Sequence, residues 1–405
     1  MRPFFEPVPA SPRQTIALAA ALQGIGGGLG WSIVPPLMPQ IAQELTLSHG
    51  WSGLVWGAAP LGIALAAPIG GAAVDRFGAR WTAGMAMVVG GLACAARALC
   101  GDGLSLAVAM FGFGLHVGFV APALPRALVS HLPLAKVARA NGLALLAYTL
   151  GTAATMLAAR TVLVPLFGGW RPAMVAAGAA MALTGALWMA LYKDRIATAK
   201  HASLGEVFSL VHNAGLRRVA AMHFCLFGGY LALLGLLFKA LVERGMAPPQ
   251  AGLSVAGWLV AAGAANFLGP IIADRLGARR PVLVAGGLTA GAGLLAIALF
   301  PGVPVLPLLV VAALGGGCVA PLLLTLPLEL PGVGPQRAGA ALGLLMLVGQ
   351  VGGFLLPVVS GYAMGLGGFA AAMAFLAVVH LLIAVPAMGL DSGRRVDATG
   401  VPAAT

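Results

Sequence analysis

The sequence predicts an all-α membrane protein with twelve transmembrane helices in two pseudo-symmetric halves of six helices each. The first observation is composition, because 60% of the residues are hydrophobic and only 8% are charged. About a quarter of the residues of a soluble domain are charged, so a chain this apolar needs a bilayer as its solvent. The second observation is a series of long apolar stretches, and the third is a charged phrase that occurs twice.

Each predicted span is an apolar stretch bounded by glycine, proline or charged residues. A helix needs about 20 mostly apolar residues to cross a bilayer. The predicted spans are 15–38, 51–74, 82–100, 104–127, 140–163, 172–192, 217–241, 251–273, 281–299, 305–328, 338–361 and 368–389. Pro301, Pro304 and Pro307 crowd a single turn in the second half, so eleven or thirteen spans are the alternatives.

The charged phrase reads GAAVDRFGAR at Gly71–Arg80 and PIIADRLGAR at Pro270–Arg279, 199 residues later. Around it, nine of the thirty positions in 51–80 are identical in 250–279. Internal duplication of this kind is typical of secondary transporters. We therefore expect two copies of a six-helix unit.

The repeat divides the chain into four predicted segments. They are a first six-helix bundle at 1–192, a cytoplasmic linker at 193–216, a second six-helix bundle at 217–390 and a cytoplasmic tail at 391–405. Within the linker, Ser203 and Glu206 have the spacing of a capping box and precede an apolar run. This pattern predicts a short helix that lies along the membrane surface.

Basic residues predict the orientation of the chain. With the N-terminus inside, 18 of the 23 Lys and Arg residues lie on the inner side, which is the bias expected of cytoplasmic loops. The other five are assigned to the outer side: Arg97, Arg160, Arg171, Lys239 and Arg244. This bias accounts for the net charge of +12, so no nucleic acid is expected as a partner. The four cysteines lie in or beside spans without metal-ligand spacing, so neither a metal site nor a cofactor is expected.

The spans, the central loop and the phrase Gly-x-x-x-Asp-Arg-x-Gly-x-Arg after the second span together resemble the major facilitator superfamily. The resemblance covers the chain outside its tails, although Pro270 replaces the leading glycine in the second copy. The run 329–353 is similar to bacterial members grouped with cyanate and nitrate carriers. The resemblance implies a monomeric, multi-pass protein of the bacterial inner membrane, with both termini cytoplasmic and with lipids and a small-molecule substrate as partners.

The two phrases supply the predicted gating residues. Asp75 lies at the inner end of span 2, where the amino end of span 11 is also expected. A carboxylate beside a helix N-terminus is stabilised by about 0.3–1 kcal/mol, so Asp75 would latch the inner gate. The alternative is that these charges only fix the orientation, and that Arg126 is an interface residue. The predicted gating set is Asp75, Arg76, Gly78, Arg80, Asp274, Arg275, Gly277, Arg279 and Arg126.

Polar side chains near mid-depth, on spans that line the cavity in that family, are the candidates for substrate binding, since polar groups there are costly. The alternative for each is a contact between helices. The candidates are Gln23, His116, Tyr148, Thr152, Tyr230, Asn266 and Gln350. No Asp or Glu lies at that depth, so His116 is also the candidate for proton coupling. His380, in the peripheral twelfth span, is expected to be a packing residue.

These observations predict a secondary active transporter, a symporter or uniporter, that moves a small organic solute by alternating access, with a weak acid as one candidate. An efflux carrier for amphipathic or drug-like compounds is the alternative, but span 5 reads LGTAATMLAA and lacks the Gly-Pro-rich phrase of drug antiporters. A non-transporting membrane sensor or scaffold on the same fold is the alternative of a different class. No HExxH, GxSxG or P-loop phrase occurs, so no enzyme is expected.

Overall fold

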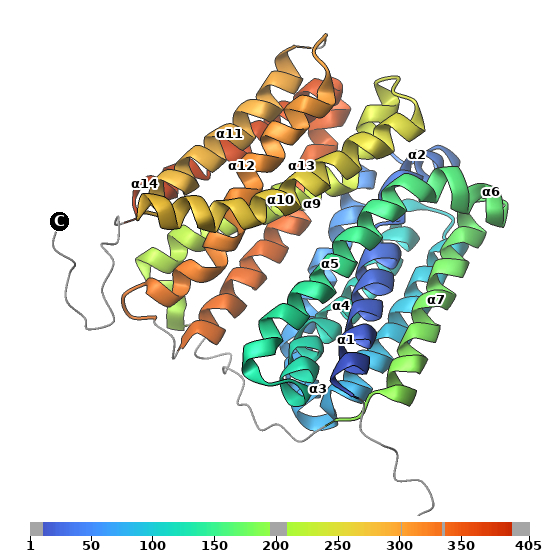
Figure 1. Ribbon diagram of the computed structural model, residues 1–405. Helices are drawn as coiled ribbons and strands as arrows, with labels where there is room; N and C mark the ends of the chain where they lie inside the picture. Colours follow the sequence, from blue (N-terminus) through green and yellow to red (C-terminus); the bar gives the residue numbers. More distant parts are fainter. Residues whose placement is uncertain (1–10, 195–208, 301, 334–336, 391–405) are drawn as a thin grey trace, which may run out of the picture. The chain divides into compact units, whose positions relative to one another are not determined.

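The computed structural model describes residues 11–194, 209–300, 302–333 and 337–390, and all regular elements within these ranges are helices (Figure 1). The capping box at Ser203 and Glu206 and the predicted tail at 391–405 lie outside the described residues.

The order of helices follows the two copies of the repeat. The elements of the first copy are α1 (Pro12–Ala21), η1 (Leu22–Trp31), α2 (Val34–Glu44), α3 (His49–Ala96), η2 (Arg97–Leu99), α4 (Gly103–His131), α5 (Leu134–Ala158), η3 (Ala159–Leu163), α6 (Val164–Phe167) and α7 (Trp170–Leu191). Those of the second copy are η4 (Leu210–His212), α9 (Ala214–Glu243), α10 (Pro248–Leu276), α11 (Arg280–Leu299), α12 (Val305–Thr325), η5 (Leu326–Glu329), α13 (Ala338–Leu381) and α14 (Ala384–Met388).

Ten helical segments of the described chain are long and apolar enough to cross a membrane. Two of them, His49–Leu99 and Gly339–Met388, are 51 and 50 residues long, which is enough for two spans each. The first breaks at Gly78 (φ 78°) and the second at Gly367 and Gly368 (φ 66° at Gly368), where the backbone leaves the helical region. A positive φ suits glycine, which has no Cβ. When the two long segments are divided at these breaks, the ten segments give the twelve predicted spans.

The helices form two compact units. The first unit comprises residues 1–37 and 62–201, and the second comprises residues 38–61 and 202–405. Each unit therefore contains the helices of one repeat, except that most of α2 and the first part of α3 pack with the second repeat. The boundaries proposed for the linker, at 193 and 216, remain predictions.

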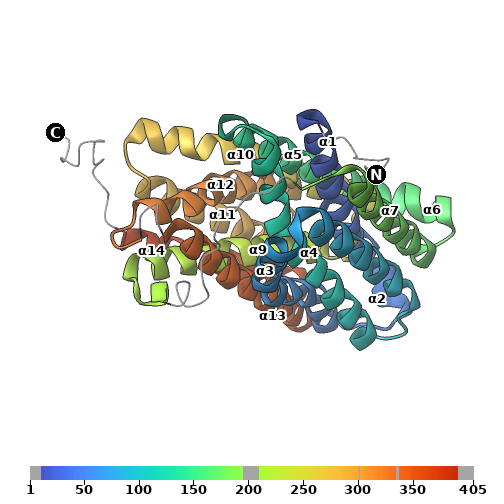
Figure 2. The ribbon, with the colours of Figure 1, turned by 90° about the horizontal axis from the view of Figure 1, so that it is seen from below.

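Glycine allows helices within each unit to approach closely. In the first unit, α5 crosses η1 where a Cβ on Gly151 would lie 2.6 Å from the carbonyl oxygen of Gly24. In the second unit, α13 lies along α9, and a Cβ on Gly352 would lie 2.6 Å from the carbonyl oxygen of Phe224. Small residues at such crossings are typical of membrane helices, because packing rather than hydrophobicity holds those helices together. Figure 2 shows α11 and α12 side by side in the same unit, consistent with their contacts.

Candidate functional site

The first copy of the phrase forms a capped turn in the first unit. The chain reverses at Gly78, and a new helical segment starts directly after it. The carboxylate of Asp194, which follows α7, accepts hydrogen bonds from the backbone N–H of Ala79 (2.8 Å) and of Arg80 (3.1 Å). It thereby satisfies N–H groups that have no partner in the first turn of a helix. Asp194 was not among the predicted residues.

The side chain of Arg80 completes this turn, since its Nε donates to the carbonyl oxygen of Met189 at 2.6 Å. Beside it, the indole of Trp188 donates to the carbonyl oxygen of Ala79 (3.2 Å) and stacks on Tyr192 at 4.4 Å. The helical segment that starts after Gly78 is thus joined to the end of α7 and to Asp194 by neutral and charged hydrogen bonds.

Asp75 and Arg126 form an ion pair, with 3.1 Å between Nη2 of the arginine and Oδ1 of the carboxylate. The pair joins α3 to α4 within the first unit. Arg126 thus has a carboxylate partner within the first unit, while its part in the gate remains a prediction. Arg76 is exposed beside it.

The second copy uses the opposite arrangement of charges. The guanidinium of Arg279 donates to the hydroxyl of Thr325 (2.5 Å) and pairs with the carboxylate of Glu329. Gly277 has a positive φ of 63° at the end of α10, while Asp274 and Arg275 are exposed. The first copy therefore contributes an acid to the end of α4, and the second contributes a base to the end of α12.

Three predicted substrate residues meet where η1 crosses α5. Tyr148 packs against Gly27, where an added Cβ would lie 2.9 Å from its Cε2, and Gln23 lies 3.6 Å from the same position. One turn further along α5, Thr152 is buried and accepts a hydrogen bond of 3.1 Å from the hydroxyl of Ser32. The structure thus brings Gln23, Tyr148 and Thr152 to one crossing.

His116 lies on another side of η1, away from that crossing. Its ring packs on Phe113 (4.3 Å between centroids), and its Nδ1 donates to the carbonyl oxygen of the same residue. Only 3% of His116 is exposed, and an added Cβ on Gly26 would lie 4.0 Å from its Nε2. His116 therefore lies in the packed interior of the first unit.

Arg97 also contacts the ring of Phe113, with its guanidinium carbon 4.1 Å from the ring centroid. Its Nη1 donates to the carbonyl oxygen of Gly30 at 2.9 Å. That carbonyl lies at the break of span 1, where Pro35 lacks an N–H to offer. Arg97 is fully buried, and its Nε and Nη2 have no hydrogen-bond partner among the described atoms. A residue that the sequence assigned to the outer side of the membrane is thus buried within the first unit.

The predicted substrate residues of the second unit do not converge. Tyr230 stacks on Trp258 with 5.3 Å between centroids, and Asn266 is exposed on α10. Gln350 is buried in α13 and its Oε1 has no partner among the described atoms. On the neighbouring α9, His223 is likewise buried, and neither of its ring nitrogens has such a partner. His223 was not among the predicted residues.

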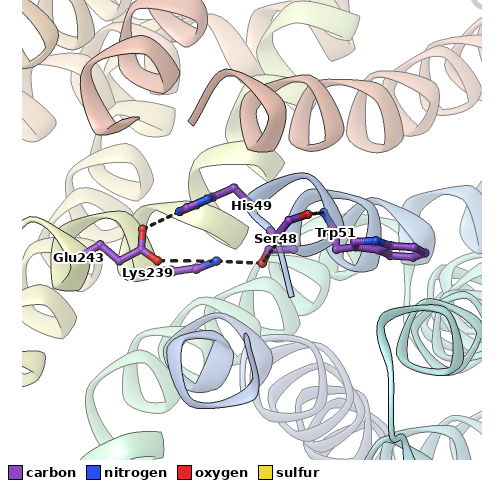
Figure 3. A network of polar contacts seen from close by, with 6 residues as sticks. Ser48, His49, Trp51, Lys239 and Glu243 are labelled. Carbon is purple, nitrogen blue, oxygen red and sulfur yellow. Dashed lines mark hydrogen bonds and ion pairs between the residues drawn. The ribbon is translucent and has the colours of Figure 1, made fainter. Parts of the chain in front are cut away.

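A further polar group, which we call the His49 cluster, comprises His49, Ser52, Lys239 and Glu243 of the second unit. Figure 3 shows the imidazole and the ammonium group directed at the carboxylate, at 3.0 Å and 3.7 Å respectively. The ammonium group, in a residue only 3% exposed, also donates to the hydroxyl of Ser52 at 2.9 Å. The cluster joins the start of α3 to the end of α9.

Close packing surrounds the His49 cluster. The indole of Trp56 donates to the carbonyl oxygen of Leu231 at 2.6 Å. Gly53 and Gly57 face α13, and an added Cβ on Gly57 would lie 2.6 Å from a backbone oxygen of that helix. The first part of α3 is thus packed on α9 and α13 at backbone distance.

Comparison with known proteins identifies the family to which this fold belongs. The profile of the Major Facilitator Superfamily matches residues 18–243 and 219–403. No curated protein matches the sequence. Among solved structures, a bacterial homolog of the human lysosomal transporter Spinster, inward-facing and occupied, is similar with a TM-score of 0.80 and 16% identity, covering 93% of this chain and 96% of that one.

Two further solved structures are similar at the level of the fold. The nucleoside transporter NupG gives a TM-score of 0.74 at 15% identity, with 93% of this chain and 98% of that chain covered. A D-xylose-proton symporter gives a TM-score of 0.72 at 15% identity, with coverage of 93% and 97%. The profile match, the repeated phrase and the twelve spans agree, and the chain belongs to the major facilitator superfamily.

Proposed function

We propose that this protein is a secondary active transporter that moves a small organic solute across a bacterial inner membrane by alternating access, as a monomer with both termini cytoplasmic. The observation that carries the proposal is the charged phrase, which occurs once in each repeat and is tied there by an ion pair to the span two positions further along. Duplicated halves that move against each other are the usual basis of alternating access.

The proposed solute site of the first unit is the crossing of η1 and α5, with Gln23, Tyr148 and Thr152. Two of the side chains, Gln23 and Tyr148, are only partly buried, so part of the surface at this crossing is accessible to a ligand. A weak acid is the preferred class of solute, and the support for it is Arg97. A buried guanidinium with two unpartnered nitrogen atoms favours a nearby anion, because an unpaired buried charge is costly.

The proposed gate consists of the two phrases. The pairs Asp75 with Arg126 and Arg279 with Glu329 each join a residue of the phrase to a neighbouring helix or to the residues just after it. These ties would hold the inner ends of each repeat together as a rigid body while the two repeats change their relative position.

Counterflow in proteoliposomes tests the proposal. Purified protein is reconstituted into liposomes loaded with unlabelled lactate, D-xylose or uridine, and uptake of the same labelled compound is followed. We expect one of these probes to accumulate transiently, and Asp75→Asn to reduce its initial rate. The absence of counterflow for every probe, in a preparation whose folding is verified by thermal melting, would favour the sensor or scaffold alternative.

A further inference from the structure

The segment η1 of the first span is wound as a π-helix, although its sequence does not favour a helix. It runs over Leu22–Trp31 with the sequence LQGIGGGLGW, so half of its residues are glycine. Glycine is unfavourable in a helix because it loses more conformational freedom on folding than any other residue. π-Helices are rare and mostly occur as single turns at functional sites. Contacts with neighbouring helices must therefore hold η1 in this form.

The carbonyl group of Gly30 has no backbone donor if the π-helical pattern continues past the end of η1. A π-helix joins each carbonyl to the N–H five residues later, and for Gly30 that residue is Pro35, which has no N–H. The guanidinium of Arg97, in η2, donates from Nη1 to the carbonyl oxygen of Gly30 at 2.9 Å. A charged side chain from another span thus satisfies a carbonyl at the end of η1.

Arg97 is held in this position without a carboxylate partner among the described residues. It is fully buried, its guanidinium carbon lies 4.1 Å from the ring centroid of Phe113, and its Nη1 lies 3.7 Å from Sγ of Cys94. Asp102, the nearest acid along the chain, instead accepts the backbone N–H of Ser105 at 2.7 Å. Because a buried charge without such a partner is costly, a neutral side chain would serve folding as well or better. The arginine therefore calls for a role other than stability.

The carbonyl that Arg97 holds is close along the chain to the crossing of η1 with α5. It lies two residues before Ser32, whose hydroxyl donates to the hydroxyl of Thr152 on α5 at 3.1 Å, and both residues are buried. Two residues before that carbonyl, a Cβ on Gly28 would lie 2.8 Å from the Cα of Gly151. The segment that Arg97 fixes is thus the one that packs on α5 at backbone distance.

We propose that Arg97 is a positioning residue, which holds η1 where it crosses α5 and so fixes Gln23 and Thr152 relative to Tyr148. The interaction uses only Nη1, and the other two nitrogens of the guanidinium take no part in it. This inference rests on the proposed function in one respect, because the crossing is taken as the solute site. The hold on η1 itself requires no solute.

Hydrogen exchange of the purified full-length protein, measured without solute, tests the hold on η1. Arg97→Met removes the donor and the charge. We expect the amides of η1 to exchange about tenfold faster, as loss of a hydrogen bond from a charged group implies, and those of α9 to be unchanged. Arg171→Met is the matched control. Arg171 also donates to a carbonyl oxygen and lies 4.5 Å from the ring of Trp170, but its hydrogen bond is to Ala98 of η2.

A double-mutant cycle with Thr152→Val tests whether the hold extends to the crossing. Thr152→Val removes the acceptor of the hydrogen bond from Ser32. If Arg97 fixes η1 on α5, that hydrogen bond is already weakened in Arg97→Met. Thr152→Val should then lower the melting temperature less in the Arg97→Met protein than in the wild type. In the Arg171→Met protein its effect should equal that in the wild type, because independent changes add.

Counterflow with uncharged probes tests the consequence for the solute. D-xylose and uridine form no ion pair with Arg97, so an effect on their transport reports the position of η1. For the probe that the wild type exchanges, Arg97→Met should raise KM about tenfold and leave the maximal rate within about threefold. Arg97→Lys keeps a charged donor without the guanidinium geometry, and its KM should lie between those of the wild type and Arg97→Met.

Unchanged exchange of η1 in Arg97→Met, or equally faster exchange in Arg171→Met, overturns the inference. An effect of Thr152→Val that is the same in the Arg97→Met protein and the wild type overturns it as well, and so does a wild-type KM in Arg97→Met. The exchange and melting experiments need no solute, so they decide the inference even if the wild type shows no counterflow. That last result would contradict the proposed function alone.

Discussion

Replacing Asp75 by Asn and Asp194 by Ala should separate gating from folding, although both carboxylates lie beside the same phrase. Asp194 accepts two backbone N–H groups at the start of a helical segment, whereas Asp75 pairs with Arg126. Both interactions lie within the first unit, and Asp75 also belongs to the predicted gate. We therefore expect opposite rankings of the two variants in stability and in transport.

The expected loss of stability is larger for Asp194→Ala. Removal of a capping side chain costs about 0.5–2 kcal/mol. For a unit of about 150–250 residues, each kcal/mol corresponds to roughly 2–4 °C, so the melting temperature should fall by about 1–8 °C. The side chains of Asp75 and Arg126 are 38% and 16% exposed, and ion pairs of this kind contribute about 0–1 kcal/mol. Asp75→Asn should therefore melt close to the wild type.

The expected loss of transport is larger for Asp75→Asn. The helix-terminus contact predicted for Asp75 would contribute about 0.3–1 kcal/mol to the closed gate, whereas the ion pair lies within one unit. Loss of that contact would change the population of the closed state by up to about fivefold, and the initial counterflow rate should fall accordingly. Asp274→Asn should be milder, because Asp274 is exposed and the second copy departs from the phrase at Pro270.

Thermal melting in detergent and counterflow in proteoliposomes are measured on the same preparations. Transport by Asp75→Asn at the wild-type rate would refute the gate and leave only a role in orientation. An unchanged melting temperature for Asp194→Ala would refute the capping interaction.

Three further outcomes are expected. His116→Gln should still exchange solute but fail to concentrate it in a pH gradient, because glutamine does not titrate between pH 5 and 8; equal loss of both activities would assign His116 to packing. Glu243→Gln should lower the melting temperature, since it leaves the buried ammonium of Lys239 without its carboxylate, and adding Lys239→Met should recover much of the loss, whereas additive losses would contradict the coupling. Gly57→Leu should cost about 1–3 kcal/mol through overpacking, and Gly71→Leu, with no atom within 4 Å of an added Cβ, is the matched control that should melt like the wild type.

The fold could be predicted from the sequence because its signals are local and repeated. Long apolar stretches indicate spans, and the two copies of the phrase indicate the duplication. Gly78 and Gly277 follow the predicted spans 2 and 8, and both have a positive φ in the structure. Such features depend on neighbours along the chain and need no knowledge of packing.

The site was less predictable, because depth along a helix does not give the direction of a side chain. Gln23, Tyr148 and Thr152 do share one crossing, but His116 at a similar depth faces another side of η1. Arg97 counts as an outer residue by position, yet its long side chain reaches the ring of Phe113 and is fully buried.

Asp194 and His223 were missed for a different reason. Asp194 acts through a turn that is brought near by folding, so no local pattern in the sequence marks it as a cap. His223 could have been noticed as a histidine within an apolar span, where a polar ring is costly unless it has a partner.

The residues 38–61 pack with the second repeat although the chain places them in the first, and this has a consequence for dividing the protein. A break in the segment 193–216 would give two polypeptides that match the two repeats in sequence but not in packing. The second polypeptide, produced alone, would leave bare the surfaces of α9 and α13 that Trp56 and Gly57 cover. We therefore expect the two polypeptides to be recovered together when they are made in the same cell, because residues 38–61 of the first polypeptide pack on helices of the second.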